Sequence, residues 1–426
     1  DRTRQYIWRQ LSRGFHHNVF LHPTCTCIRA KTSLEHSWPG FEPMTFGSWY
    51  LPLCHHRTNN SFVVPLVAEN AESFFIRYNN VPMGTERVGD RLFVTVPRRR
   101  YGIPSTLNYI DLSQDRVRSP ALRPYPSFQG SRSLVSVYRT RADQCGRLWM
   151  VDTGLMEIPG APRQVQTPAI VVFDLQTDRQ ILRYELKESD VPANNTPTGL
   201  ASITVDTSPG CDSSFAYIPD LTTYGLIVFS LRARDSWRIT NHYFHFNPVA
   251  ATLNIAGQRF QWNDGIFSIT LAPGSGCRTA YFHPMISYQE FSVDTCMLNN
   301  RTASSDPAFW EQFHIVGERG PGTQCTMHDI HDKSQVIFFA DIGRDAISCW
   351  STRRALAPEN VVLLARDSTR LSYPADLHVT DDELWVISNT LPRFGYATLN
   401  PQEYNFYIYN IVNKVKGYLR SLHTTV

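Results

Sequence analysis

The segment GRLWMVD at residues 146–152 is a short apolar strand that ends in a polar residue, and this pattern occurs six times along the chain. The other copies are DRLFVTVP (90–97), SSFAYIPD (213–220), RTAYFHP (278–284), QVIFFAD (335–341) and DELWVIS (382–388). Their first residues lie 47 to 67 positions apart. Repetition at such a period is typical of repeat architectures, propellers among them.

A second strand-like segment precedes each copy, with a short polar or glycine-containing turn between the two. These segments are GTERV (84–88), VSVYRTR (135–141), LASITVD (200–206), IFSITLA (266–272), CTMHDI (325–330) and PADLHVT (374–380). Several of them alternate polar and apolar residues, which is the two-residue period of a half-buried strand. Each repeat has room for about four strands, as a propeller blade does. We therefore predict an all-β fold, a six-bladed β-propeller with a central axial channel.

The two ends of the chain are expected to meet, because a propeller closes its ring by combining both ends in one blade. The strand-like segments AESFFIRY (71–78) and NFYIYNIV (405–412) are the predicted closing strands. Residues 1–42 show no strand pattern and are predicted to be an N-terminal arm of uncertain structure. Residues 43–426 are predicted to form the propeller.

Composition points to an extracellular protein. Charged residues make up 19% of the 426 residues, below the roughly 25% of an average domain. The net charge of +3 favours neither nucleic acid nor a membrane surface as partner. Short basic runs, at Arg98–Arg100 and Arg353–Arg354, are expected to form a solvated rim. No run of 18 apolar residues occurs, so no membrane-spanning helix is expected.

Nine cysteines and three N-glycosylation sequons, at Asn59, Asn194 and Asn300, favour secretion. The opening at Asp1 without an apolar leader is what a processed chain would show. The cysteines form no paired zinc-binding pattern, so disulfides are expected and at least one cysteine is left over. Cys145 and Cys211 stand just before copies of the apolar strand in successive blades. We predict a disulfide between them.

Several longer segments resemble the insect Yellow and major royal jelly proteins. They lie at residues 82–112, 145–154, 211–231, 260–271, 281–293, 346–350 and 384–394. The resemblance implies secretion and a six-bladed propeller. PRRRYGIPSTLNYIDL (97–112), SVYRTRADQCGRLW (136–149) and TQCTMHD (323–329) are most similar to the Yellow-f branch, the dopachrome conversion enzymes of the melanin pathway. That branch implies conversion of dopachrome or dopaminechrome, two aminochromes, to 5,6-dihydroxyindoles by isomerisation or decarboxylation.

An aminochrome is a flat, electron-poor bicycle. Its rearrangement needs a base near the carbon beside the ring nitrogen, donors at the quinone oxygens and an aromatic wall. It needs no cofactor in principle, and neither a cofactor nor a metal is predicted. The expected partner is a small aminochrome or catecholamine, with no nucleic acid and no membrane.

Polar residues of the innermost strands and of their loop ends are the candidates for this chemistry. His328 is predicted to be the base, because imidazole titrates near working pH, and its strand is expected to turn it towards the axis. Glu86 and Arg98 are the other predicted catalytic residues. The predicted substrate-binding residues are His283, Asp264, Asp376, Asn389 and Phe394.

Other polar and aromatic residues are expected to be structural. Turn capping is the favoured role of Asp152, Asp220 and Asp341. The tryptophans at positions 149, 262, 350 and 385 are expected to pack in the core.

Three alternatives stay open. Glu86, Asp152, Asp376 and Asn389 offer the hard oxygen ligands of an axial calcium site. The protein could instead carry biogenic amines without turnover, or serve as a structural extracellular protein.

Overall fold

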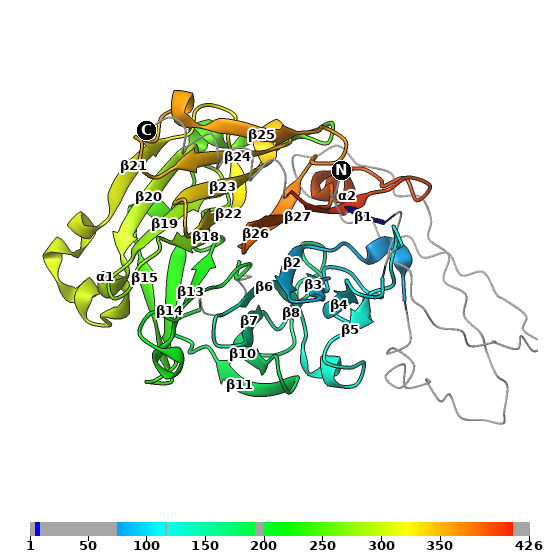
Figure 1. Ribbon diagram of the computed structural model, residues 1–426, viewed down its shortest axis with the longest axis horizontal. Coiled ribbons are helices and arrows are strands. Elements are labelled where there is room, and N and C mark those ends of the chain that lie inside the picture. The colour runs from blue at the N-terminus through cyan, green and yellow to red at the C-terminus, as the bar shows by residue number, and fades with distance from the viewer. Residues whose placement is uncertain (1–4, 9–74, 116, 192–198, 412–426) are drawn as a thin grey trace, which may run out of the picture. The chain divides into compact units, whose positions relative to one another are not determined.

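Six four-stranded antiparallel sheets follow one another around a ring (Figure 1). The computed structural model describes residues 5–8, 75–115, 117–191 and 199–411. Figure 1 shows the innermost strands β2, β6, β18, β22 and β26 around the centre of the ring. The predicted six-bladed β-propeller is confirmed.

The blades follow the chain in order. Blade 1 is β2 (Gly84–Val88), β3 (Arg91–Thr95), β4 (Leu107–Asp111) and β5 (Arg123–Pro124). Blade 2 is β6 (Val137–Ala142), β7 (Arg147–Asp152), β10 (Ala169–Asp174) and β11 (Arg179–Glu185). Blade 3 is β12 (Thr204–Asp206), β13 (Phe215–Asp220), β14 (Gly225–Ser230) and β15 (Asp235–Thr240).

The second half of the ring continues this order. Blade 4 is β18 (Ile266–Leu271), β19 (Thr279–Pro284), β20 (Gln289–Asp294) and β21 (His314–Glu318). Blade 5 is β22 (Cys325–His331), β23 (Val336–Asp341), β24 (Ala346–Ser351) and β25 (Val362–Arg366). Blade 6 is β26 (Pro374–Thr380), β27 (Glu383–Ser388), β28 (Phe406–Asn410) and β1 (Gln5–Trp8).

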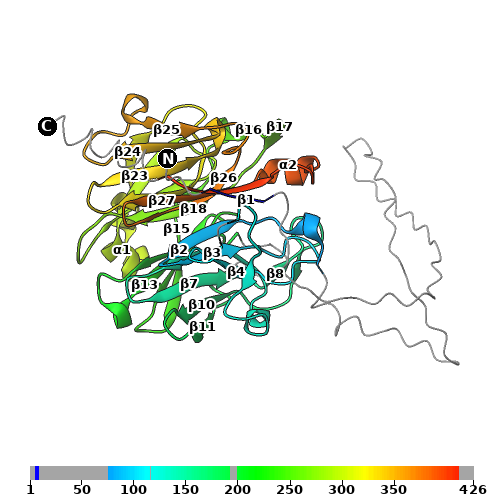
Figure 2. The same cartoon turned by 45° about the vertical axis from the view of Figure 1, so that its right-hand side comes forward.

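Smaller elements are inserted between the blade strands. They are the hairpins β8 (Leu155–Met156) with β9 (Arg163–Gln164) and β16 (Thr252–Ile255) with β17 (Gln258–Gln261), and the helices α1 (Thr295–Asn299) and α2 (Leu391–Tyr396). Figure 2 shows α2, β16, β17 and β8 on the same side of the ring. No described helix is long and apolar enough to cross a membrane.

The repeated apolar segments are the second strands of the blades, β3, β7, β13, β19, β23 and β27, and each pairs with the innermost strand that precedes it. Their side chains are mostly buried on both faces, and completely so in β7 and β23, because neighbouring blades pack against them. Trp149, Trp350 and Trp385 are all at most 2% exposed, so their predicted core role is confirmed. Trp262 differs, because it is only partly buried and lies in the loop between β17 and β18.

Both ends of the chain close the ring in blade 6, as predicted, but the N-terminal strand is not the expected one. β1 pairs antiparallel with β28, from Gln5 with Tyr409 to Trp8 with Phe406. In the predicted strand 71–78, residues 71–74 lie outside the described residues, and Arg77–Asn79 form a 3-10 helix. β1 lies within the predicted arm, and the rest of residues 1–42 lies outside the described part of the chain.

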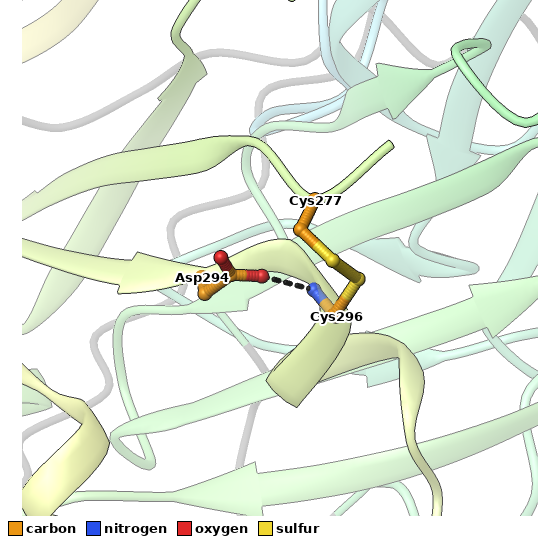
Figure 3. A group of neighbouring side chains, drawn as sticks. All are labelled: Cys277, Asp294 and Cys296. Atoms are coloured by element: carbon orange, nitrogen blue, oxygen red, sulfur yellow. Dashed lines mark hydrogen bonds between the residues drawn. A yellow bond between two sulfur atoms is a disulfide. The ribbon is translucent and has the colours of Figure 1, made fainter. Parts of the chain in front are cut away.

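The predicted disulfide between Cys145 and Cys211 is present and links blades 2 and 3. A second disulfide joins Cys277, before β19, to Cys296 in α1 (Figure 3). The backbone N–H of Cys296 donates to Asp294, which caps this helix, at 2.7 Å. Cys25, Cys27 and Cys54 lie outside the described residues.

Of the three sequons, Asn59 and Asn194 lie outside the described residues. Asn300 is exposed, and its Oδ1 accepts hydrogen bonds from the N–H and the hydroxyl of Thr302. Glycosylation at these positions stays a prediction.

Candidate functional site

A cavity of about 670 Å³ opens at the end of the ring where the innermost strands begin. Blades 1, 2, 3, 4 and 6 contribute to its lining, with loop residues that follow the second strands and residues at the start of the innermost strands. The helix α2, the loop after β17 and the loop between β8 and β9 also line it. Figure 2 shows these elements on one side of the ring. Such a volume lies within the range of small-molecule binding sites, about 300–1,000 Å³.

Aromatic residues form one wall of the pocket. The indole Nε1 of Trp262 donates a hydrogen bond to the hydroxyl of Tyr396 in α2 at 2.6 Å. Phe260 packs against both rings, with centroid distances of 4.6 Å to Trp262 and 4.9 Å to Tyr396. Tyr373 meets Trp262 edge to face at 6.1 Å. The loop after β17 and α2 therefore hold a flat apolar surface together, and Trp262 belongs to the pocket rather than to the core.

Asp264 is the carboxylate nearest to this wall in sequence. It lines the pocket and is half-buried. Its carbonyl accepts from the N–H of Ile286, which fixes the backbone at the start of β18. Burial raises the pKa of Asp264 to about 6, and the charge of Arg99 opposes this rise. Among the described residues no side chain donates a hydrogen bond to this carboxylate.

The run Arg98–Arg100 has three different environments instead of forming a solvated rim. Arg98 turns inward and donates to the carbonyls of Ile103 (2.9 Å), Leu134 (2.6 Å), Val135 (2.5 Å) and Pro104 (3.0 Å). Arg100 lies over the ring of Phe394, 3.9 Å from its centroid. Arg99 lines the pocket between them, and its buried Nε has no hydrogen-bond partner.

The floor of the pocket is made by the innermost strands. Arg139 of β6 donates to the carbonyls of Ala375 at 3.2 Å and Ala201 at 2.9 Å, in two other blades. Its Nε lies 3.6 Å from Asp376. The other carboxylate oxygen of Asp376 accepts from the N–H of Thr85 at 2.9 Å. Asp376 therefore helps to hold this floor together.

Below this floor, charged side chains meet across the axis. Arg141 of blade 2 pairs with Asp329 of the opposite blade 5 at 2.8 Å. His378 lies 3.4 Å from Asp376 and 3.9 Å from Glu86. Burial raises the pKa of Glu86, although the charges of His378 and Arg141 oppose the rise. All of these carboxylates and His378 are at most 4% exposed, so the predicted axial channel is closed at this level.

His328 does not face the axis, and the expected orientation was wrong. Its Nδ1 contacts the hydroxyl of Ser268 at 2.7 Å, and its Nε2 lies 3.0 Å from Glu290. Its ring stacks on Phe339 of β23. The neighbouring Asp329 takes the axial position, because side chains alternate along a strand. His328 is therefore packed between blades 4 and 5, outside the pocket lining.

His283 belongs to the same buried cluster. Its Nδ1 lies 3.2 Å from Glu290, and burial lowers its pKa to about 4 against the charge of Glu290. Two histidines and a carboxylate are a donor set that metals use. Here the guanidinium of Arg319 contacts Glu290 at 2.7 Å and already neutralises it, so these residues form an ion-paired packing cluster.

The remaining candidates hold loops in place. The amide of Asn389 donates to the carbonyl of Pro82 at 2.8 Å, and its Oδ1 accepts from the N–H of Leu391. It thereby fixes α2, whose Phe394 lines the pocket. The carboxylate of Asp152 accepts from three backbone N–H groups around its turn, and Asp220 does the same. Of the oxygen ligands considered for calcium, Asp152 and Asn389 are thus held by backbone groups, whereas Glu86 and Asp376 lie beside His378.

The family model described as major royal jelly protein matches residues 135–417. The chain belongs to this family. It is 43% identical over 354 residues to the L-dopachrome tautomerase yellow-f of Drosophila melanogaster. This match covers 80% of this chain and 82% of that protein. The chain is 37% identical over 350 residues to the protein yellow of the same species. That match covers 80% of this chain but 64% of the relative, so the chain spans less than two thirds of that relative's length.

Among solved structures, the chain matches virginiamycin B lyase from Staphylococcus aureus over 79% of its length, with 9% sequence identity and a TM-score of 0.42. A similarity this low says nothing about the site.

Of the eight candidate residues predicted from the sequence, two line the pocket, Asp264 and Phe394. The prediction missed Arg99, Arg139 and Tyr373, although all three lie in or beside the repeated segments. The alternation of VSVYRTR could have indicated Arg139, since this strand faces the axis with every second residue. No signal in the sequence separates Arg99 from the arginines beside it.

Proposed function

We propose that this protein is a secreted dopachrome tautomerase, which converts dopachrome or dopaminechrome to 5,6-dihydroxyindoles in the pocket at the mouth of the ring. The two disulfides suit an oxidising compartment. The relative named L-dopachrome tautomerase, at 43% identity, supports the choice of reaction.

The observation that carries the proposal is a half-buried carboxylate beside a flat aromatic wall. Two protons must leave the saturated carbons of the aminochrome, the first from the carbon beside the ring nitrogen. One of the released electron pairs completes the new carbon–carbon double bond, and the other reduces the quinone, whose oxygens gain two protons. In decarboxylation, carbon dioxide leaves in place of the proton beside the nitrogen. Neither route consumes an oxidant or a reductant.

Asp264 is the proposed base. A carboxylate with a pKa of about 6 is ionised at neutral pH and more basic than an ordinary aspartate, as general-base catalysis requires. The wall of Trp262 and Tyr396, whose rings pack against Phe260, would hold the flat ring beside it.

Two tyrosines are the proposed donors to the quinone oxygens. Tyr138 and Tyr373 line the pocket, and burial raises the pKa of both hydroxyls. They therefore keep their protons at neutral pH and can stabilise the negative charge that develops on oxygen.

The test follows the loss of dopachrome colour with purified protein. Asp264→Asn is expected to slow turnover by about 10²- to 10⁴-fold, the usual contribution of a general base. Asp332→Asn is the matched control, because Asp332 is exposed in the β22–β23 turn at the other end of the ring. Near-normal turnover by Asp264→Asn would remove it as the base. If a folded His328→Gln variant were then inactive, the role would return to His328.

A second candidate function, an amine carrier, is favoured by the same carboxylate. A carboxylate beside aromatic rings also suits an ammonium group. Calorimetric binding of dopamine, together with no loss of dopachrome colour, would favour the carrier over the enzyme. Neither binding nor turnover would favour a structural role.

A further inference from the structure

Arg99 differs from every other arginine that lines the pocket. Arg139 is bonded to two backbone carbonyls of the floor, and Arg100 lies over Phe394 and donates to its carbonyl. Within the described part of the chain, the guanidinium of Arg99 has no hydrogen-bond or ion-pair partner, and its Nε is buried. Arg99 as a whole is only partly buried, but a buried N–H donor without a partner costs free energy, so a ligand that accepts a hydrogen bond from it is favoured.

Arg99 and Asp264 share the pocket without forming an ion pair. The charge of Arg99 opposes the rise in the pKa of Asp264, and it also acts on the hydroxyls of Tyr138 and Tyr373. All four side chains line the same pocket. The pocket offers a positive group, a base and two neutral donors to a molecule lying between them.

We propose that Arg99 forms a subsite for the carboxylate beside the ring nitrogen of the substrate, so that the pocket prefers aminochromes derived from an amino acid to those derived from an amine. This inference rests on the proposed function. Dopachrome and dopaminechrome are a matched pair, because they differ only in this carboxylate.

The chemistry of the subsite suits the reaction. Guanidinium binds a carboxylate through two parallel hydrogen bonds, which fixes orientation as well as adding affinity. The carbon that bears the carboxylate also bears the first proton to be removed. An arginine that holds the acid group therefore fixes the position of that C–H bond relative to Asp264. Dopaminechrome has no acid group and gains none of this orientation.

The experiment measures initial rates of both substrates with the wild type, Arg99→Gln and Arg353→Gln. Arg353 is the control, since it is exposed and far from the pocket lining. In Arg99→Gln, kcat/KM for dopachrome is expected to fall about 10- to 100-fold, the effect of losing a hydrogen bond to a charged group, with a higher KM from lost affinity and a lower kcat from lost orientation. For dopaminechrome it should change less than about threefold. Arg353→Gln should leave both substrates unchanged.

Failure of this inference can be told from failure of the proposed function. If the wild type converts both substrates and Arg99→Gln affects them equally, or affects neither, the carboxylate subsite is wrong while the enzyme stands. If the wild type converts neither, the proposed function is wrong, and calorimetry with indoline-2-carboxylate and indoline decides the subsite. Tighter binding of the acid, lost in Arg99→Gln, supports it; equal binding of the two compounds overturns it.

Discussion

Asp264 illustrates how a single residue acquires reactivity from its position. It lies between the tryptophan of the aromatic wall and the first residues of an innermost strand, where water reaches it only in part. Partial removal from water favours the protonated form, which is why the pKa rises to about 6. Folding thus disfavours the charge of this group, which makes it more basic than an ordinary aspartate and suits it to the proposed role of base.

Turnover is therefore expected to rise with pH through a midpoint of about 6. The base must be ionised, so activity is lost as pH falls below the pKa. A rate profile between pH 4.5 and 8 measures this, and Asp264→Asn should show low, pH-independent residual activity. A wild-type profile that stayed flat across this range would contradict the assignment.

Stability should depend on pH in the opposite direction, which provides a control for unfolding. The folded-state pKa is raised above the ordinary value of 3.8, so the native state binds more protons than the unfolded state between pH 3.8 and about 6. Asp264 therefore makes the fold less stable as pH rises through that window. Asp264→Asn should melt no lower than the wild type at pH 7.5, so its inactivity would not reflect unfolding.

The residues of the site show the limit of prediction from one sequence. The alternation along the innermost strands identifies which residues are buried or axial, and a turn residue such as Asp264 follows from its place before a strand. The direction of His328 could not be read from the sequence. CTMHDI allows either His328 or Asp329 to face the axis, and in the structure it is Asp329 that pairs with Arg141 there. The environments of three consecutive arginines depend on carbonyls and rings from distant segments, which no local pattern encodes.

At the scale of elements, the two disulfides differ in the length of chain that they close. Cys145 and Cys211 are 66 positions apart, whereas Cys277 and Cys296 are 19 apart. The first restrains two neighbouring blades, and the second restrains a single corner of blade 4 (Figure 3).

Removing each disulfide by paired Cys→Ser substitution should therefore lower the free energy of unfolding by different amounts. Loop-closure entropy gives about 4 kcal/mol for Cys145–Cys211 and about 3 kcal/mol for Cys277–Cys296. Denaturant unfolding of the two double variants measures this. A larger loss for the shorter link would show that local strain or packing, rather than chain entropy, sets the contribution.

The elements that build the pocket were harder to foresee than the blades. Repetition identified the first two strands of all six blades, since these are the most buried and most regular. The hairpins β8–β9 and β16–β17 and the helix α2 have no counterpart in the other blades, so a search for repeats passes over them. These irregular insertions supply Trp262 and Tyr396, and the distinctive chemistry of the mouth is therefore concentrated where the sequence is least periodic.

At the scale of the whole molecule, the ring is closed by the pairing of β1 with β28. Without β1, β28 becomes an edge strand with unpaired backbone groups, which favours association with other chains. The pairing also joins the two ends of a long chain in one sheet.

Deletion of residues 1–8 should therefore lower the thermal midpoint and increase aggregation. Deletion of residues 1–4 keeps β1 and is the control. Thermal melts and light scattering of the two truncated proteins measure the effect. Equal melting of the two would show that the ring is held by the inter-blade packing and not by this strand pair.

The filled axis also determines how a small molecule can enter and leave the pocket. Arg139 and the charged pairs beneath it fill the axis at the floor of the pocket, so a molecule bound in the pocket is expected to enter and leave through the mouth. In the proposed reaction, substrate and product would therefore share this mouth, and each product molecule would have to leave before the next substrate enters. In a tunnel open at both ends, entry and exit would proceed independently. For the proposed enzyme, we therefore expect product release through the mouth to limit the rate once the chemical step is fast.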